Sequence, residues 1–297
     1  MRTEDPWRIT KAFIAGPLLE VAVPKPGNVS RLRDFSDLSL YNFLLAETSV
    51  VDVYYEVASG KLRSVGRAIE LAVERSKAVQ SANPNFGIVT LSIPLIMALS
   101  RKRNEKEIGK TASAIIRAST PEDSVAFYRA VRLASPKGLS EGVEYDVYSD
   151  ESLGRLLRED VNLWKLAEMS CERELVFCEW LNGYELTERT ARRLEELFKT
   201  HDVEDAVLRA FLELMAEVRD TLIERRAGRD VAEKVREMAG DVLKGRISIE
   251  KLDSFLREDE RRNPGSLADV TAVALSLVLL RSHRLAGRFL KAKLNGR

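Results

Sequence analysis

Apolar residues recur along the chain at spacings of three and four, which is the period of an amphipathic helix and not the alternation of a strand. Cap and stop residues separate the periodic segments from one another. The pattern therefore predicts an all-α protein, formed as a single compact multi-helix domain of about ten to twelve helices over residues 1–297. No repeat of fixed period, low-complexity tract or long linker divides the chain.

The first predicted helix begins at Pro6, after Asp5 as N-cap, and ends near Val23. A second one covers residues 36–58, and we expect its apolar face to lie deep in the domain. That face consists of Leu38, Tyr41, Leu45, Val51 and Tyr55. The remaining predicted helices span 64–81, 88–101, 105–118, 121–134, 150–181, 187–199, 203–226, 229–244 and 249–258, and a last apolar helix follows residue 266. Residues 135–149 form the longest irregular stretch, and loops of this length are often functional or mobile.

Charge and composition narrow the function classes. Forty-seven basic and forty-six acidic residues leave a net charge of +1, so no overall field attracts a polyanion and nucleic acid is not an expected partner. The N-terminus lacks the pattern of a signal peptide, and the apolar runs are shorter than the roughly 20 residues of a spanning helix. We therefore expect a cytoplasmic protein without a membrane partner. Glutamine occurs once, and dense mixed charge hints at a thermophilic source.

The cysteines predict no disulfide. Cys171 and Cys178 are seven residues apart within one predicted helix, where the separation is too long for a bridge. We interpret them as buried thiols in a reducing compartment. With His201 and His283 as the two imidazoles, the sequence does not support a zinc or iron site.

Three short loops share one chemistry. They cover residues 26–28, 83–87 and 263–266, and each combines a proline, a glycine and an asparagine. The latter two lead into helix N-termini, which favour anions such as phosphate, and the first is preceded by a mobile cation. The candidate phosphate-binding residues are Lys25, Gly27, Asn28, Asn83, Asn85, Gly87, Asn263, Gly265 and Ser266. The alternative is that these loops are ordinary helix connections.

Three aspartates stand near these loops. Asp34 and Asp37 are three residues apart, so both side chains can point the same way. Two carboxylates suit Mg²⁺ bound together with phosphate oxygens, so both are candidate metal ligands. Asp269 lies in the first turn of the last apolar helix, and all three aspartates are candidate catalytic residues. The alternative for each is a helix cap.

Several segments together resemble the triphosphoribosyl-dephospho-CoA synthase family. They are residues 21–29 followed by Asp34, the 83–87 loop, and the Asn-Pro-Gly-Ser-Leu-Ala-Asp run of 263–269, in the family's order and approximate spacing. The similarity is closest to the archaeal branch, which residues 31–37 and 179–187 also resemble.

The resemblance implies an all-α transferase that uses ATP with Mg²⁺. Such an enzyme joins the ribose 2′-hydroxyl of 3′-dephospho-CoA to C1 of the ATP ribose and releases adenine. Breaking an N-glycosidic bond passes through an oxocarbenium-like state, which nearby carboxylates stabilise. Cations and helix N-termini would hold the triphosphate.

The chain also departs from the family's bacterial members. Their Asn-Thr-His-Lys-Gly loop is replaced here by residues 83–87, without the histidine and the lysine. Their Gly-Ala-His-x-Asp-Met element leaves either Asp34 or Asp37 as its counterpart. Three interpretations follow: a nucleotide-dependent transferase of this family, with the family's acceptor or a changed one, a non-catalytic binder of a phosphorylated molecule, and a helical scaffold whose loops are only connections.

Overall fold

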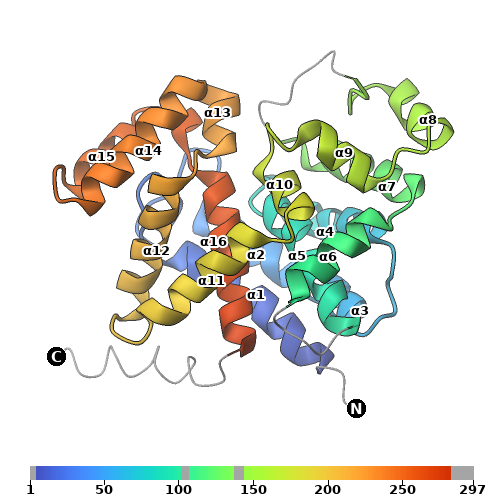
Figure 1. Cartoon of the computed structure of the whole chain (residues 1–297), viewed down its shortest axis with the longest axis horizontal. Coiled ribbons are helices and arrows are strands. Elements are labelled where there is room, and N and C mark those ends of the chain that lie inside the picture. The colour runs from blue at the N-terminus through green and yellow to red at the C-terminus, as the bar shows by residue number, and fades with distance from the viewer. Residues whose placement is uncertain (1–4, 102–106, 137–143, 282–297) are drawn as a thin grey trace. The chain divides into compact units, whose positions relative to one another are not determined.

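The computed structural model describes residues 5–101, 107–136 and 144–281 (Figure 1). Within these ranges it contains sixteen α-helices, one 3₁₀ helix and no strand. The prediction of an all-α protein is confirmed, whereas the prediction of ten to twelve helices is too low. His201 lies within the described ranges, but His283 and residues 137–143 of the long irregular stretch lie outside them.

The count is higher because three predicted helices are broken by residues that start a new helix. The 36–58 segment forms α2 (Leu40–Ser49) and α3 (Val51–Ala58). The 150–181 segment forms α8 (Asp150–Arg158), α9 (Leu163–Ser170) and α10 (Leu175–Leu181), and the 203–226 segment forms α12 (Val203–Glu217) and α13 (Thr221–Ala227). Asn162 and Asp220 are the N-caps of α9 and α13, because their side chains accept hydrogen bonds from Lys165 N–H and Ile223 N–H.

The break at Val50 also changes which face of α2 is buried. Tyr41 is 72% exposed and Leu45 is 47% exposed, so the prediction that they lie deep in the domain is wrong. Ala46, Glu47 and Val50 are buried instead, each with 0% of its surface exposed. Glu47 therefore lies in the interior of the protein, although the apolar pattern predicted a different buried face for this helix.

The chain divides into two compact units, each built from two separate segments. One unit, which we call the 41–185 unit, combines residues 1–11 with 41–185, and the other, the 186–297 unit, combines residues 12–40 with 186–297. Helix α1 (Pro6–Ala22) contributes residues to both. A single domain over residues 1–297 stays a prediction.

In the 41–185 unit the most deeply buried helix is α5 (Phe86–Arg101), where every residue from Ile88 to Leu99 is buried. Trp180 and Tyr184 hold it by donating to the carbonyls of Thr90 and Leu91, at 3.3 and 3.1 Å. The other helices of this unit are α4 (Val65–Val79), α6 (Ile108–Arg117) and α7 (Pro121–Ala134), together with α2, α3 and α8 to α10.

In the 186–297 unit the central helix is α16 (Gly265–Arg281). Gly16 of α1 lies against it so closely that a Cβ would be 2.6 Å from the backbone nitrogen of Ser276, so only glycine fits there. The helices α11 (Glu185–Leu197), α12, α13, α14 (Arg229–Leu243), α15 (Ile249–Arg257) and η2 (Glu260–Arg262) complete the unit. Residues 260–281 are long and apolar enough to cross a membrane, but 72% of their apolar stretch is buried, as in a core helix.

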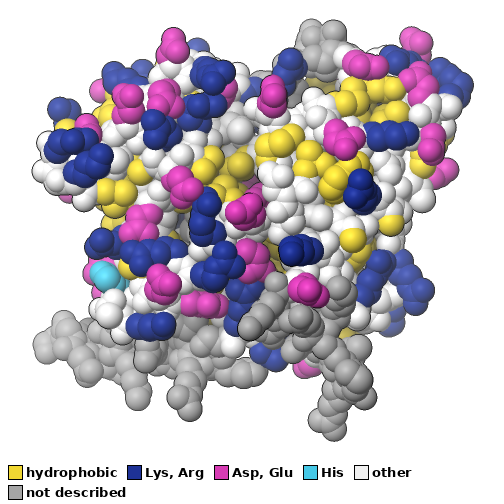
Figure 2. All heavy atoms as spheres, in the orientation of Figure 1, with side chains coloured by type: hydrophobic (Ala, Val, Ile, Leu, Met, Phe, Trp, Pro, Cys, Tyr) yellow, Lys and Arg dark blue, Asp and Glu magenta, His cyan; other side chains and the backbone are white. Residues whose placement is uncertain are grey.

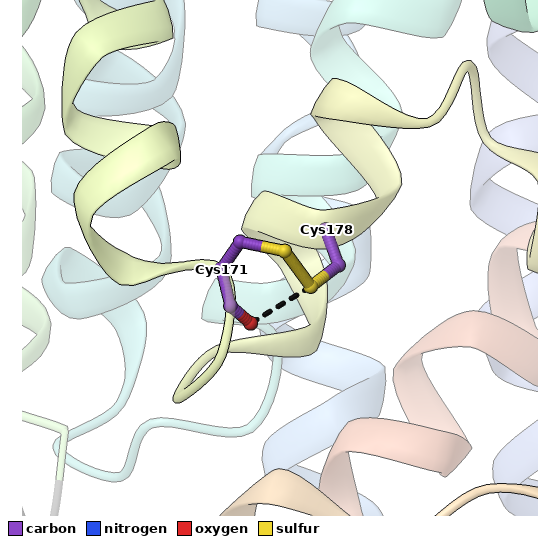
Figure 3. Close-up of a disulfide and its surroundings, with 2 residues drawn as sticks. All are labelled: Cys171 and Cys178. Atoms are coloured by element: carbon purple, nitrogen blue, oxygen red, sulfur yellow. Dashed lines mark hydrogen bonds between the residues drawn. A yellow bond between two sulfur atoms is a disulfide. The ribbon is translucent and has the colours of Figure 1, made fainter.

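Cys171 and Cys178 form a disulfide (Figure 3). The helix predicted through both cysteines ends at Ser170, and the turn before α10 brings their Cα atoms to 4.6 Å. The prediction of two free thiols is therefore wrong, and the argument for a reducing compartment loses its basis.

Charged side chains of both signs are intermingled on the face drawn in Figure 2. Among the described residues many charged side chains are paired, as in the contacts Arg193–Glu213 at 2.7 Å and Arg281–Glu188 at 2.6 Å. The similar numbers of acidic and basic residues in the sequence thus form local ion pairs in the structure.

Candidate functional site

The loop at residues 24–28 is held tightly against α15. Gly27 has φ +68°, and its N–H donates to Asp253 Oδ1 at 2.9 Å. A Cβ at Gly27 would lie 2.7 Å from the side chain of Leu256, so both the backbone angle and the space require glycine. Arg257 donates to the carbonyl of Asn28 at 2.6 Å, which fixes the end of the loop.

Lys25 is not the mobile cation that the sequence predicts. Its side chain is fully buried, and its ammonium group lies 3.2 Å from Glu20 Oε1. The same group donates to the carbonyls of Glu20 and Val23 at 2.5 and 3.0 Å, so its charge is paired and two of its three protons have acceptors. Burial raises the pKa of Glu20 and lowers that of Lys25, while their mutual attraction opposes both shifts. Contact with phosphate requires Lys25 to leave these partners.

The loop at 263–266 leads into α16, but a carboxylate already lies at this helix N-terminus. Asp220 accepts from Leu267 N–H of α16 and from Ile223 N–H of α13, each at 2.9 Å. Burial raises the pKa of Asp220 to about 6, although these backbone donors lower it. The hydroxyl of Ser266 accepts from Leu222 N–H at 3.2 Å. Gly265 lies against the same leucine, since a Cβ would be 2.8 Å from the Leu222 side chain.

Asp34 and Asp37 are both exposed. Asp34 Oδ1 accepts from Leu40 N–H at 3.0 Å, so it caps the start of α2. Ser36, between the two aspartates, donates from its hydroxyl to Glu260 Oε1 at 2.7 Å. The described residues contain no group of three His, Cys, Asp or Glu side chains arranged to hold a metal. The binding of Mg²⁺ by Asp34 and Asp37 therefore stays a prediction.

Most predicted site residues gather in the 186–297 unit. Arg33 pairs with Asp253 at 2.9 Å, the same side chain that binds Gly27 N–H, and the Ser36–Glu260 contact lies three residues before Asn263. The 24–28 loop, the two exposed aspartates and the 263–266 loop thus approach one another through α15 and η2. Asp269, in the first turns of α16, is partly buried.

Asn83, Asn85 and Gly87 belong to the 41–185 unit. Asn83 and Gly87 are partly exposed, whereas Asn85 is buried directly before α5. The side-chain oxygen of Asn85 accepts from the Ser76 hydroxyl at 3.2 Å, and its carbonyl accepts from Val89 N–H at 2.9 Å.

One feature is common to all three loops. Asn28 Nδ2, Asn85 Nδ2 and Asn263 Oδ1 are buried side-chain atoms without a hydrogen-bond partner in the described structure. A buried amide without a partner costs about 1–3 kcal/mol, and a bound water, ion or ligand group is one way to satisfy it. Each loop therefore carries one unused hydrogen-bonding group.

The sequence reasoning did not find three buried acids, Glu20, Glu47 and Asp220. All three show 3% exposure or less. Glu20 lies between Leu19 and Val21 within a helix, and this placement is the signal that could have identified it. Glu47, between Ala46 and Thr48, has no such signal. Asp220 could have been identified as an N-cap inside a segment read as continuous helix.

Together these features define an all-helical protein with three loops that each hold a buried asparagine atom without a hydrogen-bond partner in the described structure. A profile of the family described as ATP:dephospho-CoA triphosphoribosyl transferase matches residues 6–287, and the chain belongs to this family. The fold is similar to the crystal structure of an Archaeoglobus fulgidus protein described as a triphosphoribosyl-dephospho-CoA synthase. That comparison has a TM-score of 0.66 and 24% sequence identity over 80% of this chain and 99% of the other. No curated protein matches the sequence.

Proposed function

We propose that this chain is a nucleotide-dependent transferase that moves the triphosphoribosyl group of ATP to the ribose 2′-hydroxyl of 3′-dephospho-CoA. The bond between C1 of the ATP ribose and adenine breaks, and a bond from C1 to the acceptor oxygen forms. The hydroxyl proton leaves the acceptor, and adenine departs with a proton. Family membership supports a transferase. The observation that carries the proposal is the unpartnered buried amide atom in each of the three loops.

The residues of the 186–297 unit suit two tasks in this reaction. Asp34 and Asp37 are exposed oxygen donors and would hold Mg²⁺, which supplies positive charge to the triphosphate. Asp269 is the acid we assign to the reacting ribose, where its charge stabilises an oxocarbenium-like state or its carboxylate accepts the hydroxyl proton. Asn28 and Asn263 would offer their unused donor and acceptor to the substrate.

Two glycines, Gly27 and Gly265, shape the loops because they admit close approach of the backbone. The hydroxyl of Ser266 accepts a hydrogen bond at the start of α13. Lys25 and the α16 N-terminus have partners already, which favours a second candidate function: binding of another phosphorylated small molecule on the same fold, with or without catalysis. A lysine and a helix N-terminus that are both occupied weaken the case for a triphosphate in particular.

We further propose a cytoplasmic protein of an archaeal thermophile that uses small-molecule substrates and has no nucleic-acid or membrane partner. A disulfide is compatible with this location because intracellular proteins of hyperthermophiles are rich in disulfides.

The decisive experiment incubates the purified protein with ATP, Mg²⁺ and 3′-dephospho-CoA and measures free adenine by chromatography and the conjugate by mass. Coenzyme A, whose ribose carries a 3′-phosphate, is the control acceptor. Asp34→Asn and Asp37→Asn should weaken Mg-ATP binding at least tenfold without lowering the Tm. Asp52→Asn, an exposed aspartate paired with Arg75 in the other unit, is the matched control. ATP binding without adenine would favour the second candidate function, and absence of ATP binding would reject the first.

A further inference from the structure

Asp220 is a buried aspartate to which the proposed reaction gives no role, and only 2% of its surface is exposed. Its Oδ1 accepts from Ile223 N–H and its Oδ2 accepts from Leu267 N–H, each at 2.9 Å. The first contact is the N-cap of α13 and joins residues three positions apart. The second contact joins residues 47 positions apart, so it connects the start of α13 to the start of α16.

The contact with Leu267 lies at a point where α16 cannot supply an acceptor of its own. The first N–H groups of a helix have no acceptor within the helix. At the start of α16 the first helical bond runs from Ala268 N–H to the carbonyl of Pro264, at 3.2 Å. Leu267 N–H precedes it, and its acceptor is the side chain of Asp220. This bond therefore fixes the point where the 263–266 loop enters the helix.

The two residues that follow Asp220 bind the same loop. The hydroxyl of Thr221 donates to the hydroxyl of Ser266 at 3.0 Å, and Leu222 N–H donates to the same oxygen at 3.2 Å. The side chain of Leu222 lies against Gly265, where a Cβ would be 2.8 Å from it. Residues 220–222 thus contact three consecutive residues at the end of the loop, and we call this set of contacts the 220–222 clamp.

Asn263 is the residue of this loop with an unused polar atom. Its Oδ1 is buried and has no hydrogen-bond partner in the part of the chain that the structure describes. Its carbonyl accepts from Gly265 N–H at 2.9 Å, and the one residue between them is Pro264, whose ring fixes a backbone angle. So short and restricted a connection leaves little freedom, because Gly265 itself belongs to the clamp. The clamp therefore determines where the side chain of Asn263 lies.

The second carboxylate oxygen is what distinguishes aspartate from asparagine at position 220. Burial raises the pKa of Asp220 to about 6 against its backbone donors, which lower it, so the group is charged at neutral pH. Because this pKa is higher in the folded than in the unfolded state, ionisation lowers the free energy of unfolding as the pH rises toward 6. Aspartate thus offers a second acceptor here and not a more favourable charge.

We infer that Asp220 is a positioning residue, which holds Leu267 with its second oxygen and thereby places Asn263 for contact with the substrate. The role of Asn263 in binding ATP rests on the proposed function, whereas the 220–222 clamp does not. Asparagine separates the two contacts of Asp220, because it caps helices as well as aspartate does but has one acceptor oxygen in place of two. Asp220→Asn therefore keeps the cap of α13 and releases Leu267.

The first test measures exchange of single backbone amides by NMR in the full-length protein without ligand. In Asp220→Asn the Leu267 amide should exchange about tenfold faster while the Ile223 amide keeps its rate, and in Asp220→Ala both should accelerate. The control is Asp202→Asn, an N-cap of the same unit that accepts from Asp205 N–H of α12 at 2.9 Å and should leave both amides unchanged. Unchanged exchange of Leu267 in Asp220→Asn would overturn the inference, even if Asp220→Ala fails to fold.

The second test titrates the same proteins, together with Asn263→Ala, with ATP and Mg²⁺ by calorimetry. Asp220→Asn and Asn263→Ala should each weaken binding about tenfold, as expected for one lost hydrogen bond, and Asp202→Asn should not. Because Asp220 acts through Asn263, the double variant should bind no more weakly than Asn263→Ala alone. Losses that add in the double variant would overturn the inference. Faster exchange of Leu267 in Asp220→Asn, with no ATP binding by the unmodified protein, would support the clamp and reject the proposed substrate.

Discussion

The ammonium group of Lys25 lies 3.2 Å from a carboxylate oxygen of Glu20, and neither side chain is more than 4% exposed. The pair closes the end of α1 just before the turn at Gly27. Moving two charges out of water costs free energy, which the attraction between the partners offsets. Removing one partner leaves the other charge buried and uncompensated.

Lys25→Met should therefore destabilise the protein by about 3–5 kcal/mol, because it leaves the Glu20 carboxyl group buried without its partner. The double variant Glu20→Gln with Lys25→Met should recover most of this loss. Urea denaturation of the two variants measures the difference. If the single variant is as stable as the unmodified protein but binds ATP much more weakly, Lys25 is a phosphate ligand and its buried pairing is secondary.

Gly27→Ala should destabilise the protein by about 2–4 kcal/mol, of which about 1–2 kcal/mol is the left-handed backbone and the rest is the clash with Leu256. Gly245→Ala is the matched control, because it has the same φ of +68° in the same unit and nothing within 4 Å of its Cβ. The difference between the two midpoints of chemical denaturation isolates the clash. Equal losses would mean that the loop can move away from α15.

The stability of the protein should fall with rising pH because of Glu47. Its pKa of about 8 in the folded state is above the usual 4.5, so between these values the folded state keeps a proton that the unfolded state has lost. The free energy of unfolding then decreases by about 1.4 kcal/mol per pH unit, or about 5 kcal/mol in total by pH 8.

Glu47→Gln should match the unmodified protein near pH 4.5 and become the more stable of the two as the pH approaches 8. Denaturation at pH 5, 6.5 and 8 gives the slope, and Glu70→Gln, at another buried glutamate of this unit, which pairs with Arg67 at 2.8 Å, serves as control. A constant difference between Glu47→Gln and the unmodified protein over this range would show that Glu47 is charged in the folded state.

Replacing both cysteines by serine should lower the stability by about 2 kcal/mol, because the bond closes a short loop of the unfolded chain. A reductant should produce a similar decrease in the Tm of the unmodified protein and none in the double serine variant. Alkylation before and after reduction counts the accessible thiols, and two alkylated cysteines in the untreated protein would contradict the disulfide.

Helical periodicity was sufficient to predict the class of the fold, because burial along an amphipathic helix leaves a regular pattern in the sequence. It was not sufficient at Asn162 and Asp220, where a side chain caps a new helix inside a segment whose apolar spacing continues across the break. The same difficulty placed Tyr41 inside and left Glu47 unnoticed, since the break at Val50 shifts the buried face of α2.

For the candidate site, the sequence identified the loops but not the side chains that already bind Lys25 and the N-terminus of α16. Proline, glycine and asparagine identify a loop that can approach a ligand, and Gly27 and Asn263 do lie in such loops. The pairing of Lys25 with Glu20 depends on how the chain folds at the end of α1. The contact of Asp220 with Leu267 joins residues that are 47 positions apart in the sequence. Neither contact leaves a local pattern.

In each unit, one aspartate side chain accepts backbone hydrogen bonds at the N-termini of two helices. Asp123 accepts from the backbone at the starts of α4 and α7, and Asp220 does so for α13 and α16. Each carboxylate acts as a resident counter-ion that a dissolved anion would have to displace. By contrast, α5 begins after the neutral amide of Asn85, and Glu47, a buried acid of the same unit, has a pKa of about 8 and is protonated at neutral pH. Of the two helix starts that the candidate loops lead into, α5 is therefore the one where an arriving phosphate meets no competing negative charge.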